Sequence, residues 1–215
     1  LIDDELTAMY GALLAYAGAS DCVQAILDAA DFAPRSYRAP TPYFYRDEAG
    51  VAPHNLFLDV NALYGLAAQQ GHGQQLDVRG MIFSNNPPLN PAGSGMVVEV
   101  EYAATLASWV YDASRGIYLR FSDGQPHLDA NNGVQVAAEN VVILYARHNL
   151  TDIVESEWQG NKSYSIEIEL WFEGDAVLLR DGRRYNVRWS RPTRESLISL
   201  YTLDGEPMPF KPGNT

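Results

Sequence analysis

The sequence contains a single cysteine, Cys22, among its 215 residues. One cysteine forms no disulfide within the chain and supplies no thiolate cluster for a metal ion. Cys22 lies in the segment SDCVQAILDAA, whose spacing of apolar residues is typical of a helix. We therefore expect Cys22 to be a small buried side chain rather than a nucleophile.

Long apolar runs and positive charge are also scarce. No stretch reaches the roughly 20 apolar residues that a membrane-spanning helix requires. The 27 Asp and Glu residues outnumber the 15 Lys and Arg residues, which gives a formal net charge of −12. Such a surface repels phosphate backbones and anionic lipid headgroups. The composition therefore argues against nucleic acid as a partner and against membrane binding through a polybasic surface.

Several catalytic and nucleotide-binding motifs are missing from the sequence. It has no Walker loop, no G-x-G-x-x-G and no H-E-x-x-H. The GSG at residues 93–95 lies in a proline-rich segment and lacks the strand-turn-helix context of a nucleophile elbow. A metal site would need His54, His127 and Asp129 to converge, which their spacing does not indicate. We expect neither a cofactor nor a metal.

Residues 1–90 are predicted to form a helix-rich part. Apolar residues recur every three or four positions after Leu6, which predicts a helix capped by Asp3 or Asp4 and ended by Gly18. Two more helices are expected, over residues 21–30 and over residues 60–70 with Asp59 as the cap. A strand is expected over residues 43–46, and the segment at 85–95, rich in Pro, Asn and Gly, is the predicted boundary.

Residues 91–215 are predicted to form a strand-rich part. NVVILYAR, from Asn140, is a continuous apolar run, typical of a central strand buried on both faces. SYSIEIELWF, from Ser163, alternates strictly, which predicts a strand with Tyr164, Ile166 and Ile168 on its buried face. Three Asp-Gly pairs predict turns, and a short helix is expected over residues 193–200. The predicted fold class is α+β, with mixed or antiparallel sheet layers and helices on one side, a layered ββα-type sandwich.

The first of these turns, Asp123-Gly124, organises the segment GIYLRFSDGQPHLD. A two-residue turn there predicts that Ser122 faces Gln125, Arg120 faces His127, and Tyr118 faces Asp129. One face of the hairpin then carries four polar side chains, while Ile117, Leu119 and Phe121 point into a core. Tyr118 and Arg120 are candidate ligand-binding residues, and His127 oriented by Asp129 is the candidate catalytic pair. The alternative is a surface patch of salt bridges.

A second candidate site lies near Pro53. His54 and Asn55 follow this proline, so a rigid loop could present them to a ligand; alternatively, Asn55 fixes the turn and His54 bonds the backbone. Arg46 follows three aromatic residues and either faces an anionic ligand or stacks on a ring. Arg46, His54 and Asn55 are therefore predicted to bind ligand together with the hairpin face.

An ordered series of motifs runs through nearly the whole chain: GALLAYAGAS, PHNL, VYDASRGIYLRFSDGQPHLD, AENVVIL and DGEPMPFKPGNT. With this series the sequence resembles the YerB-like family of bacterial lipoproteins, a domain of unknown function. The resemblance implies an extracytoplasmic location in the cell envelope and an α+β sandwich, and it implies no reaction. Members usually have a targeting signal, a lipidated cysteine and an upstream Arg-rich portion. We therefore expect that the usual N-terminal portion is lacking here, and that only a lipid anchor outside this chain would give membrane attachment.

Three functions follow as hypotheses. The first is a non-catalytic envelope module that binds a wall-derived or anionic ligand, such as a glycan, a peptide or an anionic small molecule. The second is a hydrolase or transferase on a cell-wall substrate, in which His127 is the acid/base, Asp129 orients it and Arg120 holds an anionic group. The third is a structural domain that only contacts other proteins.

Overall fold

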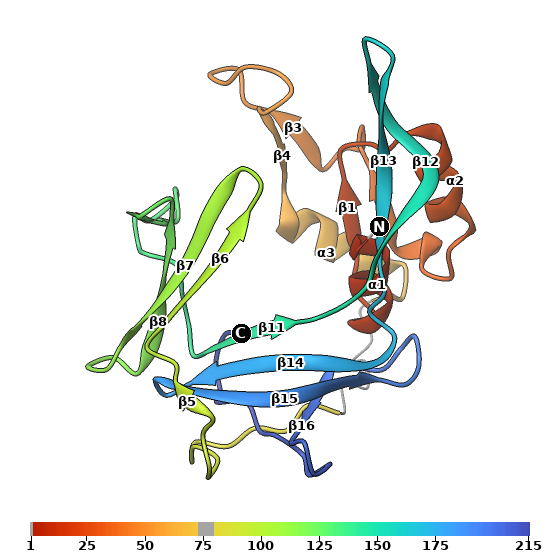
Figure 1. Cartoon of the computed structure of the whole chain (residues 1–215). Helices are drawn as coiled ribbons and strands as arrows, with labels where there is room; N and C mark the ends of the chain where they lie inside the picture. The colour runs from red at the N-terminus through yellow and green to blue at the C-terminus, as the bar shows by residue number, and fades with distance from the viewer. Residues whose placement is uncertain (1, 73–79) are drawn as a thin grey trace. The chain divides into compact units, whose positions relative to one another are not determined.

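The computed structural model describes residues 2–72 and 80–215 (Figure 1). The chain forms two compact units, each assembled from segments that are distant in the sequence. Unit 1 comprises Leu1–Val78, Arg147–Leu170 and Arg194–Ser196, and unit 2 comprises Arg79–Ala146, Trp171–Thr193 and Leu197–Thr215. The predicted division into a helix-rich part, 1–90, and a strand-rich part, 91–215, stays a prediction.

Unit 1 holds the helices and several short strands. Its elements are α1 (Ile2–Met9), β1 (Leu14–Tyr16), α2 (Asp21–Ala29), the 3-10 turn η1 (Ala33–Arg35), β2 (Ser36–Arg38), β3 (Phe44–Arg46), β4 (Leu56–Leu58), α3 (Val60–Gln69), β12 (His148–Trp158) and β13 (Asn161–Ile168). The fully buried Phe32 packs with Ala8 of α1 and Leu27 of α2. A second cluster joins Tyr37 of β2 to Leu63 and Ala67 of α3.

The first predicted helix is wrong in its second half. The helix α1 ends at Met9, and Gly11 follows it with a φ of 52°. Leu14–Tyr16 is instead the strand β1, which pairs in parallel with Ser36–Arg38. The predicted caps Asp3 and Asp4 lie inside the first turn of α1. The backbone pairing with β2 outweighs the helical spacing of the apolar side chains.

The other two helices of unit 1 are confirmed. The helix α2 begins at Asp21, and α3 begins at Val60 after Asp59, whose Oδ1 accepts the Ala62 N–H at 3.0 Å. Cys22, however, is exposed, so its predicted burial is wrong. Cys22 lies on the outer side of α2, whereas Leu27 provides the buried contact.

Unit 2 contains strands only, within its described residues. Its elements are β5 (Gly93–Ser94), β6 (Val97–Tyr102), β7 (Thr105–Asp112), β8 (Ile117–Ser122), β9 (Gln125–Pro126), β10 (Ala137–Ala138), β11 (Asn140–Leu144), β14 (Phe172–Arg180), β15 (Arg183–Arg191) and β16 (Ser199–Tyr201). One sheet has the order β10-β8-β7-β6 with β9 attached to β8, and the other has the order β11-β14-β15-β16 with β5 attached to β15 (Figure 1).

The strand β11 is an edge strand, which corrects its predicted central position. It pairs with β14, and no other strand of the described chain joins its second edge. Its two faces are nevertheless both apolar, because they serve different clusters. Val141 and Ile143 pack with Tyr118 and Leu179, whereas Val142 and Leu144 pack against the cluster around Trp189. The apolar run of β11 is therefore explained by the burial of both its faces, and it does not require a second neighbouring strand.

Two further predictions about unit 1 and unit 2 are wrong. The helix expected over residues 193–200 does not form; its last two residues instead begin β16, in which Leu200 pairs with Trp189 of β15. In β13 the predicted buried face is wrong for its first two members, since Tyr164 and Ile166 are 41% and 44% exposed, whereas Ser165 on the opposite face is 1% exposed. β12 and β13 form a two-stranded ribbon, so alternation along the strand does not specify which face meets a core.

The Asp-Gly turns and the predicted fold class are confirmed. At Asp181-Gly182 both residues have positive φ, 53° and 67°, and the turn connects β14 to β15. The third pair forms a different turn, in which Gly205 has a φ of 87° and donates to the Thr202 carbonyl. The described chain combines helices with mostly antiparallel sheets, which is a mixed α+β fold.

Candidate functional site

The hairpin from β8 to β9 in unit 2 begins as the sequence predicts. Asp123 and Gly124 have φ values of 50° and 77°, and Ser122 pairs with Gln125. The carboxylate of Asp123 accepts the Leu106 N–H at 2.8 Å and the Thr105 hydroxyl at 3.0 Å. Because both bonds favour the charged form, with the backbone bond first, they hold the pKa of Asp123 below its ordinary value.

The predicted register is kept as far as His127 and is lost after it, so the predicted pair of Tyr118 with Asp129 is wrong. The His127 N–H still donates to the Arg120 carbonyl at 3.0 Å, as the hairpin requires. The chain then leaves β8, and β10 takes its place, with Ala138 paired to Tyr118. Asp129 begins a separate turn, in which its Oδ1 accepts the Asn131 N–H at 2.7 Å. This excursion was not predictable from a turn signal at Asp123 alone.

Tyr118 belongs to the core of unit 2. It is 0% exposed and packs with Val141 and Leu179, and the ring centroid of Tyr111 lies 5.0 Å from its own. Its hydroxyl makes no hydrogen bond of standard geometry. Burial raises the pKa of Tyr118 well above its ordinary value, although the nearby backbone of Gly182 opposes this shift. The face predicted to be polar is therefore the face that packs onto the second sheet.

Arg120 lies on the same face as Tyr118 but is only half-buried. Its guanidinium carbon is 6.0 Å from the ring centroid of Trp109, its cross-strand partner. Within the described chain this guanidinium has no hydrogen bond and no carboxylate partner. The predicted surface patch of salt bridges between Arg120 and Asp129 is therefore absent from residues 80–215. Arg120 is held by an aromatic ring and retains its five N–H donors.

His127 and Asp129 do not contact each other through their side chains in the described structure. The His127 ring is exposed and makes no hydrogen bond there, and one carboxylate oxygen of Asp129 is used by its own turn. An imidazole is usually oriented by a hydrogen bond to its second nitrogen. The assignment of these two residues as a catalytic pair stays a prediction.

Arg46 and Asn55 lie together in unit 1. Arg46 Nη1 donates to Asn55 Oδ1 at 2.7 Å, and Asn55 Nδ2 donates to the Asp47 carbonyl at 2.9 Å. Asn55 is buried, whereas Arg46 and His54 are exposed. Asn55 thus fixes the loop between β3 and β4, and the stacked rings of Tyr45 and Phe57, 5.9 Å apart, flank the same hairpin.

The predicted site residues fall into different units. Arg46, His54 and Asn55 belong to unit 1, and Tyr118, Arg120, His127 and Asp129 belong to unit 2. Their combination into one pocket stays a prediction. Among the described residues, no group of three or more His, Cys, Asp and Glu side chains is placed to hold a metal ion.

The sequence did not reveal a buried charged cluster in unit 2. Asp181 binds Arg180 at 2.9 Å through one oxygen and Lys211 at 3.0 Å through the other. Arg180 is fully buried and also donates to the carbonyls of Ser84 and Pro209. Lys211 Nζ reaches the Gly116 carbonyl at 2.6 Å. From the sequence alone, charged residues next to a hairpin turn are expected to be exposed to solvent. Nothing in the local pattern indicates that the C-terminal segment covers them.

This cluster connects segments that carry the family resemblance. Gly116 and Asn140 come from VYDASRGIYLRFSDGQPHLD and AENVVIL, and Lys211 comes from DGEPMPFKPGNT. Asn140 Oδ1 accepts the Lys211 N–H at 2.8 Å, and Asn140 Nδ2 donates to the Lys211 carbonyl at 2.8 Å. Motifs that are far apart in the sequence therefore meet through hydrogen bonds in unit 2.

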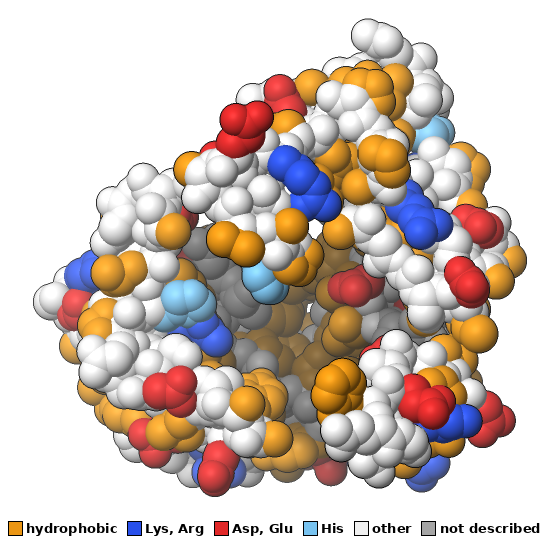
Figure 2. Space-filling model, turned by 90° about the horizontal axis from the view of Figure 1, so that it is seen from above, with side chains coloured by type: hydrophobic (Ala, Val, Ile, Leu, Met, Phe, Trp, Pro, Cys, Tyr) orange, Lys and Arg blue, Asp and Glu red, His pale blue; other side chains and the backbone are white. Residues whose placement is uncertain are grey.

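The charges on the surface are mixed. Figure 2 shows Asp and Glu side chains interspersed with Lys, Arg and hydrophobic side chains over one face, without a single patch of one sign. The excess of 27 Asp and Glu residues over 15 Lys and Arg residues therefore forms no continuous acidic patch on the face that is shown.

The fold and the site define a mixed α+β protein with mostly antiparallel sheets, two units whose segments alternate along the sequence, and an Arg-aromatic pair across β7 and β8. The chain belongs to the family described as "Protein of unknown function (DUF3048)". The C-terminal domain of that family matches residues 98–215, and the N-terminal domain matches residues 2–73.

Two comparisons extend this assignment. The chain is 26% identical over 176 residues to "Putative lipoprotein YerB" of Bacillus subtilis (strain 168), which covers 80% of this chain and 49% of that protein. It thus spans about half the length of this relative. The crystal structure of the YerB protein from Bacillus subtilis superposes with a TM-score of 0.75 at 22% identity, covering 99% of this chain and 68% of the other. The resemblance to the YerB-like family is confirmed.

Within residues 2–72 and 80–215, none of the helices has both the length and the apolar character needed to cross a bilayer.

Proposed function

We propose that this chain is an extracytoplasmic domain of the cell envelope that binds a small anionic ligand through Arg120 and does no chemistry on it. The similarity to a protein named as a lipoprotein supports the envelope location. The placement of Arg120 supports the binding role. It is the observation that carries the proposal: a half-buried guanidinium rests on Trp109 without a carboxylate partner in the described structure.

The other arginines that are held in place in the described units serve structural contacts. Arg180 binds Asp181, and Arg188 reaches Glu173 at 3.0 Å. Arg194 binds Glu5 at 3.1 Å and Asp31 at 3.4 Å. Arg120 differs because an aromatic ring fixes its position while its N–H groups remain available. A planar fork of donors in this state suits a carboxylate or a phosphate, which it can bind through two parallel hydrogen bonds.

The charge of the molecule limits the size of the ligand. A net charge of −12 repels extended polyanions over the length of the surface. A ligand with one compact anionic group, joined to an uncharged glycan or peptide, avoids most of this repulsion. The ligand class is therefore a wall-derived fragment with a single carboxylate or phosphate group.

Among the described residues of unit 2, no contact favours the hydrolase or transferase hypothesis over binding. The carboxylate of Asp129 accepts from Asn131, and His127 has no oriented partner in the described chain. His127 is close to Arg120 through the backbone bond between them, and it is proposed as a rim residue of the binding site.

The test compares Arg120→Ala with Arg115→Ala, which removes the same charge from an exposed turn of unit 2. Binding of purified cell-wall fragments, inorganic phosphate and N-acetyl-alanine is measured by calorimetry at low salt. We expect at least one of these probes to bind the parent and Arg115→Ala equally, and to bind Arg120→Ala at least about tenfold more weakly, since a hydrogen bond to a charged group contributes roughly 1.5–3 kcal/mol.

Three outcomes contradict the proposal. Equal binding by Arg120→Ala and the parent removes Arg120 from the site, and a failure of every anionic probe to bind the parent removes the anionic ligand. Turnover of a wall fragment by the parent, lost in His127→Ala, establishes the enzyme instead. Near-ultraviolet circular dichroism of each variant checks that the fold is retained.

A further inference from the structure

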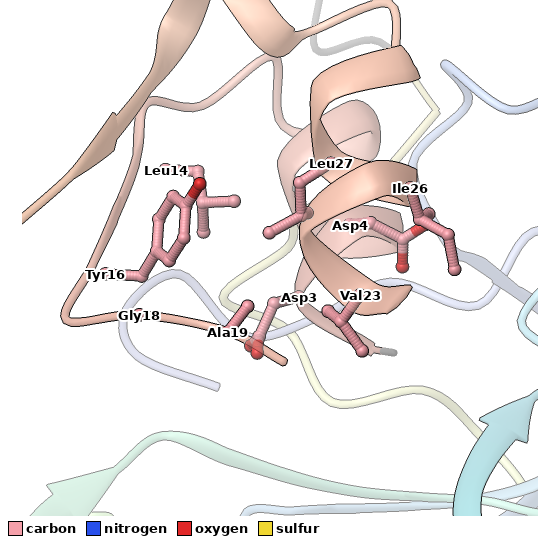
Figure 3. Close-up of a pocket in the computed structure, with 9 residues that line it drawn as sticks. All are labelled: Asp3, Asp4, Leu14, Tyr16, Gly18, Ala19, Val23, Ile26 and Leu27. Carbon is pink, nitrogen blue, oxygen red and sulfur yellow. The ribbon is translucent and has the colours of Figure 1, made fainter. Parts of the chain in front are cut away.

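Unit 1 contains a cavity of about 120 Å³ that none of the candidate site residues lines. Its walls come from three elements: Leu14 and Tyr16 of β1, Val23, Ile26 and Leu27 of α2, and Asp3 and Asp4 of α1, with Gly18 and Ala19 between β1 and α2. Figure 3 shows Tyr16 and Leu14 on one side, Leu27 and Val23 on the other, and the carboxylate of Asp4 next to Ile26.

Some of the polar groups around the cavity have hydrogen-bond partners, and one does not. The Tyr16 hydroxyl accepts a hydrogen bond from Gln24 Nε2 at 2.9 Å, and the same nitrogen donates to Asp28 Oδ1 at 2.7 Å. Asp4 Oδ1, by contrast, is buried and has no hydrogen-bond partner. The cavity therefore combines apolar walls with one unused, buried acceptor that belongs to a carboxylate.

The neighbouring charges leave this acceptor without a direct counterion. Arg194 lies close enough to influence Asp4, but its Nη1 bonds Glu5 at 3.1 Å and its Nη2 bonds Asp31 at 3.4 Å. Burial and the charge of Glu5 raise the pKa of Asp4, while Arg194 and a backbone bond oppose them. Burial is the largest cause, and a carboxyl in this position gains stability when a cation donates to it.

We propose that this cavity binds an alkylammonium group, a short apolar stem that ends in a primary ammonium, as in a lysine side chain. The stem would pack against Leu14, Val23 and Leu27, and the ammonium would donate to Asp4 Oδ1. The volume is too small for a drug-sized ligand but accommodates a side chain of a few carbons. This inference uses unit 1 alone and is independent of the anionic ligand proposed for Arg120.

The experiment titrates the full chain with three probes that share a butyl stem. The probes are n-butylammonium, n-butyltrimethylammonium, which has the charge but no N–H donor, and 1-butanol, which has neither the charge nor the ammonium. Binding is followed by ¹H–¹⁵N chemical-shift changes in β1 and α2. We expect n-butylammonium to bind at least about tenfold more tightly than the other two, since it alone forms a charge-assisted hydrogen bond with Asp4.

Variants test the two parts of the site separately. Asp4→Asn removes the charge and keeps the shape, whereas Asp21→Asn removes the same charge from an exposed position near the cavity that does not line it. Ala19→Leu fills the cavity and leaves Asp4 in place. We expect Asp4→Asn and Ala19→Leu each to weaken n-butylammonium binding at least about tenfold, with Asp21→Asn close to the parent.

Several results overturn the proposal. Unchanged n-butylammonium binding in Asp4→Asn shows that its carboxylate is not the acceptor, and unchanged binding in Ala19→Leu shows that the cavity is not the site. Equal affinity for 1-butanol shows simple partition into an apolar space. If Asp4→Asn fails to fold, the comparison of Ala19→Leu with Asp21→Asn and the ranking of the three probes decide the question.

Discussion

At the scale of single residues, Asn140 is decisive for unit 2. Its side chain is fully buried and bonds the backbone of Lys211 through both its oxygen and its nitrogen, with 2.8 Å in each case. In sequence, Asn140 is only the first residue of an apolar run. Its partner lies 71 positions away, so no local pattern indicates that this amide attaches the C-terminal segment.

Replacing Asn140 by Ala leaves the N–H and the carbonyl of Lys211 without partners inside the protein. Since an unsatisfied buried polar group costs roughly 1–3 kcal/mol, we expect the free energy of unfolding of Asn140→Ala to fall by about that amount. Urea denaturation measures the change. Asn131→Ala, at an exposed position, is the control and should stay within about 0.5 kcal/mol of the parent. A loss no larger than the control's contradicts the structural role of Asn140.

Arg120 and Arg46 show how far residue types alone determine a site. The sequence left two roles open for Asn55, and the turn-fixing role matches its bond to the Asp47 carbonyl, while aromatic residues flank Arg46 as the sequence shows. It did not indicate that Arg120 would rest on Trp109, because that contact depends on the pairing of β7 with β8. The position of the Arg120 guanidinium, on which the proposed function depends, is therefore set by the pairing of these two strands.

At the scale of elements, the hairpin turns were predictable and the strand neighbours were not. An Asp-Gly pair determines its own turn, because glycine adopts positive φ without a steric cost. Which strand pairs with β8 beyond Arg120 depends on the excursion through residues 127–136, and β10 replaces β9 there. The predicted four-residue polar face is divided at this point into buried Tyr118, half-buried Arg120 and Asp129, and exposed His127.

Two glycines at equivalent turn positions form a matched pair for mutation. Gly124 and Gly182 have φ values of 77° and 67°. A Cβ at Gly124 meets nothing within 4 Å, whereas a Cβ at Gly182 would lie 2.8 Å from the Tyr111 ring and 2.9 Å from Met96 Sδ. Gly124→Ala should cost about 1–2 kcal/mol of unfolding free energy from its left-handed backbone.

Gly182→Ala should cost roughly 1–3 kcal/mol more than Gly124→Ala, since it adds a clash to the same backbone penalty. Thermal and urea unfolding of both variants measure this difference. Equal losses in the two variants would show that Tyr111 and Met96 move aside freely, and would refute tight packing at the Asp181-Gly182 turn.

At the scale of the whole molecule, each unit is assembled from separate segments. Arg194 comes late in the sequence and yet binds Glu5 and Asp31 within unit 1. The ribbon of β12 and β13 likewise belongs to unit 1, although strands of unit 2 precede and follow it in sequence. The composition along the sequence indicates a helix-rich part followed by a strand-rich part. It does not indicate that segments late in the sequence belong to the same unit as the N-terminal helices.

Asp123 contributes to the pH dependence of the free energy of unfolding, and the direction of its pKa shift determines the sign of this contribution. Its pKa is lower in the folded chain than the ordinary value of 3.8, because it accepts from Leu106 and Thr105. The stabilisation is therefore complete above the ordinary pKa and disappears as the pH falls through the lowered folded value. Asp123→Asn keeps an acceptor and a good turn residue but does not titrate.

We expect the midpoint of thermal unfolding to fall less steeply below pH 4 in Asp123→Asn than in the parent, and calorimetry from pH 6 to pH 2.5 measures the two slopes. Parallel slopes would mean that the bonds of Asp123 do not distinguish the folded from the unfolded state.

The sequence by itself determined the family, the α+β class, the helices α2 and α3, and the Asp-Gly turns between β8 and β9 and between β14 and β15. These features depend on short-range chemistry, namely caps, turn conformations and periodic apolar residues. Tertiary structure alone decided the edge position of β11, the burial of Tyr118, the charged cluster around Asp181 and the cavity beside Asp4. Each of these results from a contact between distant segments, whose burial and hydrogen bonds outweigh local preference.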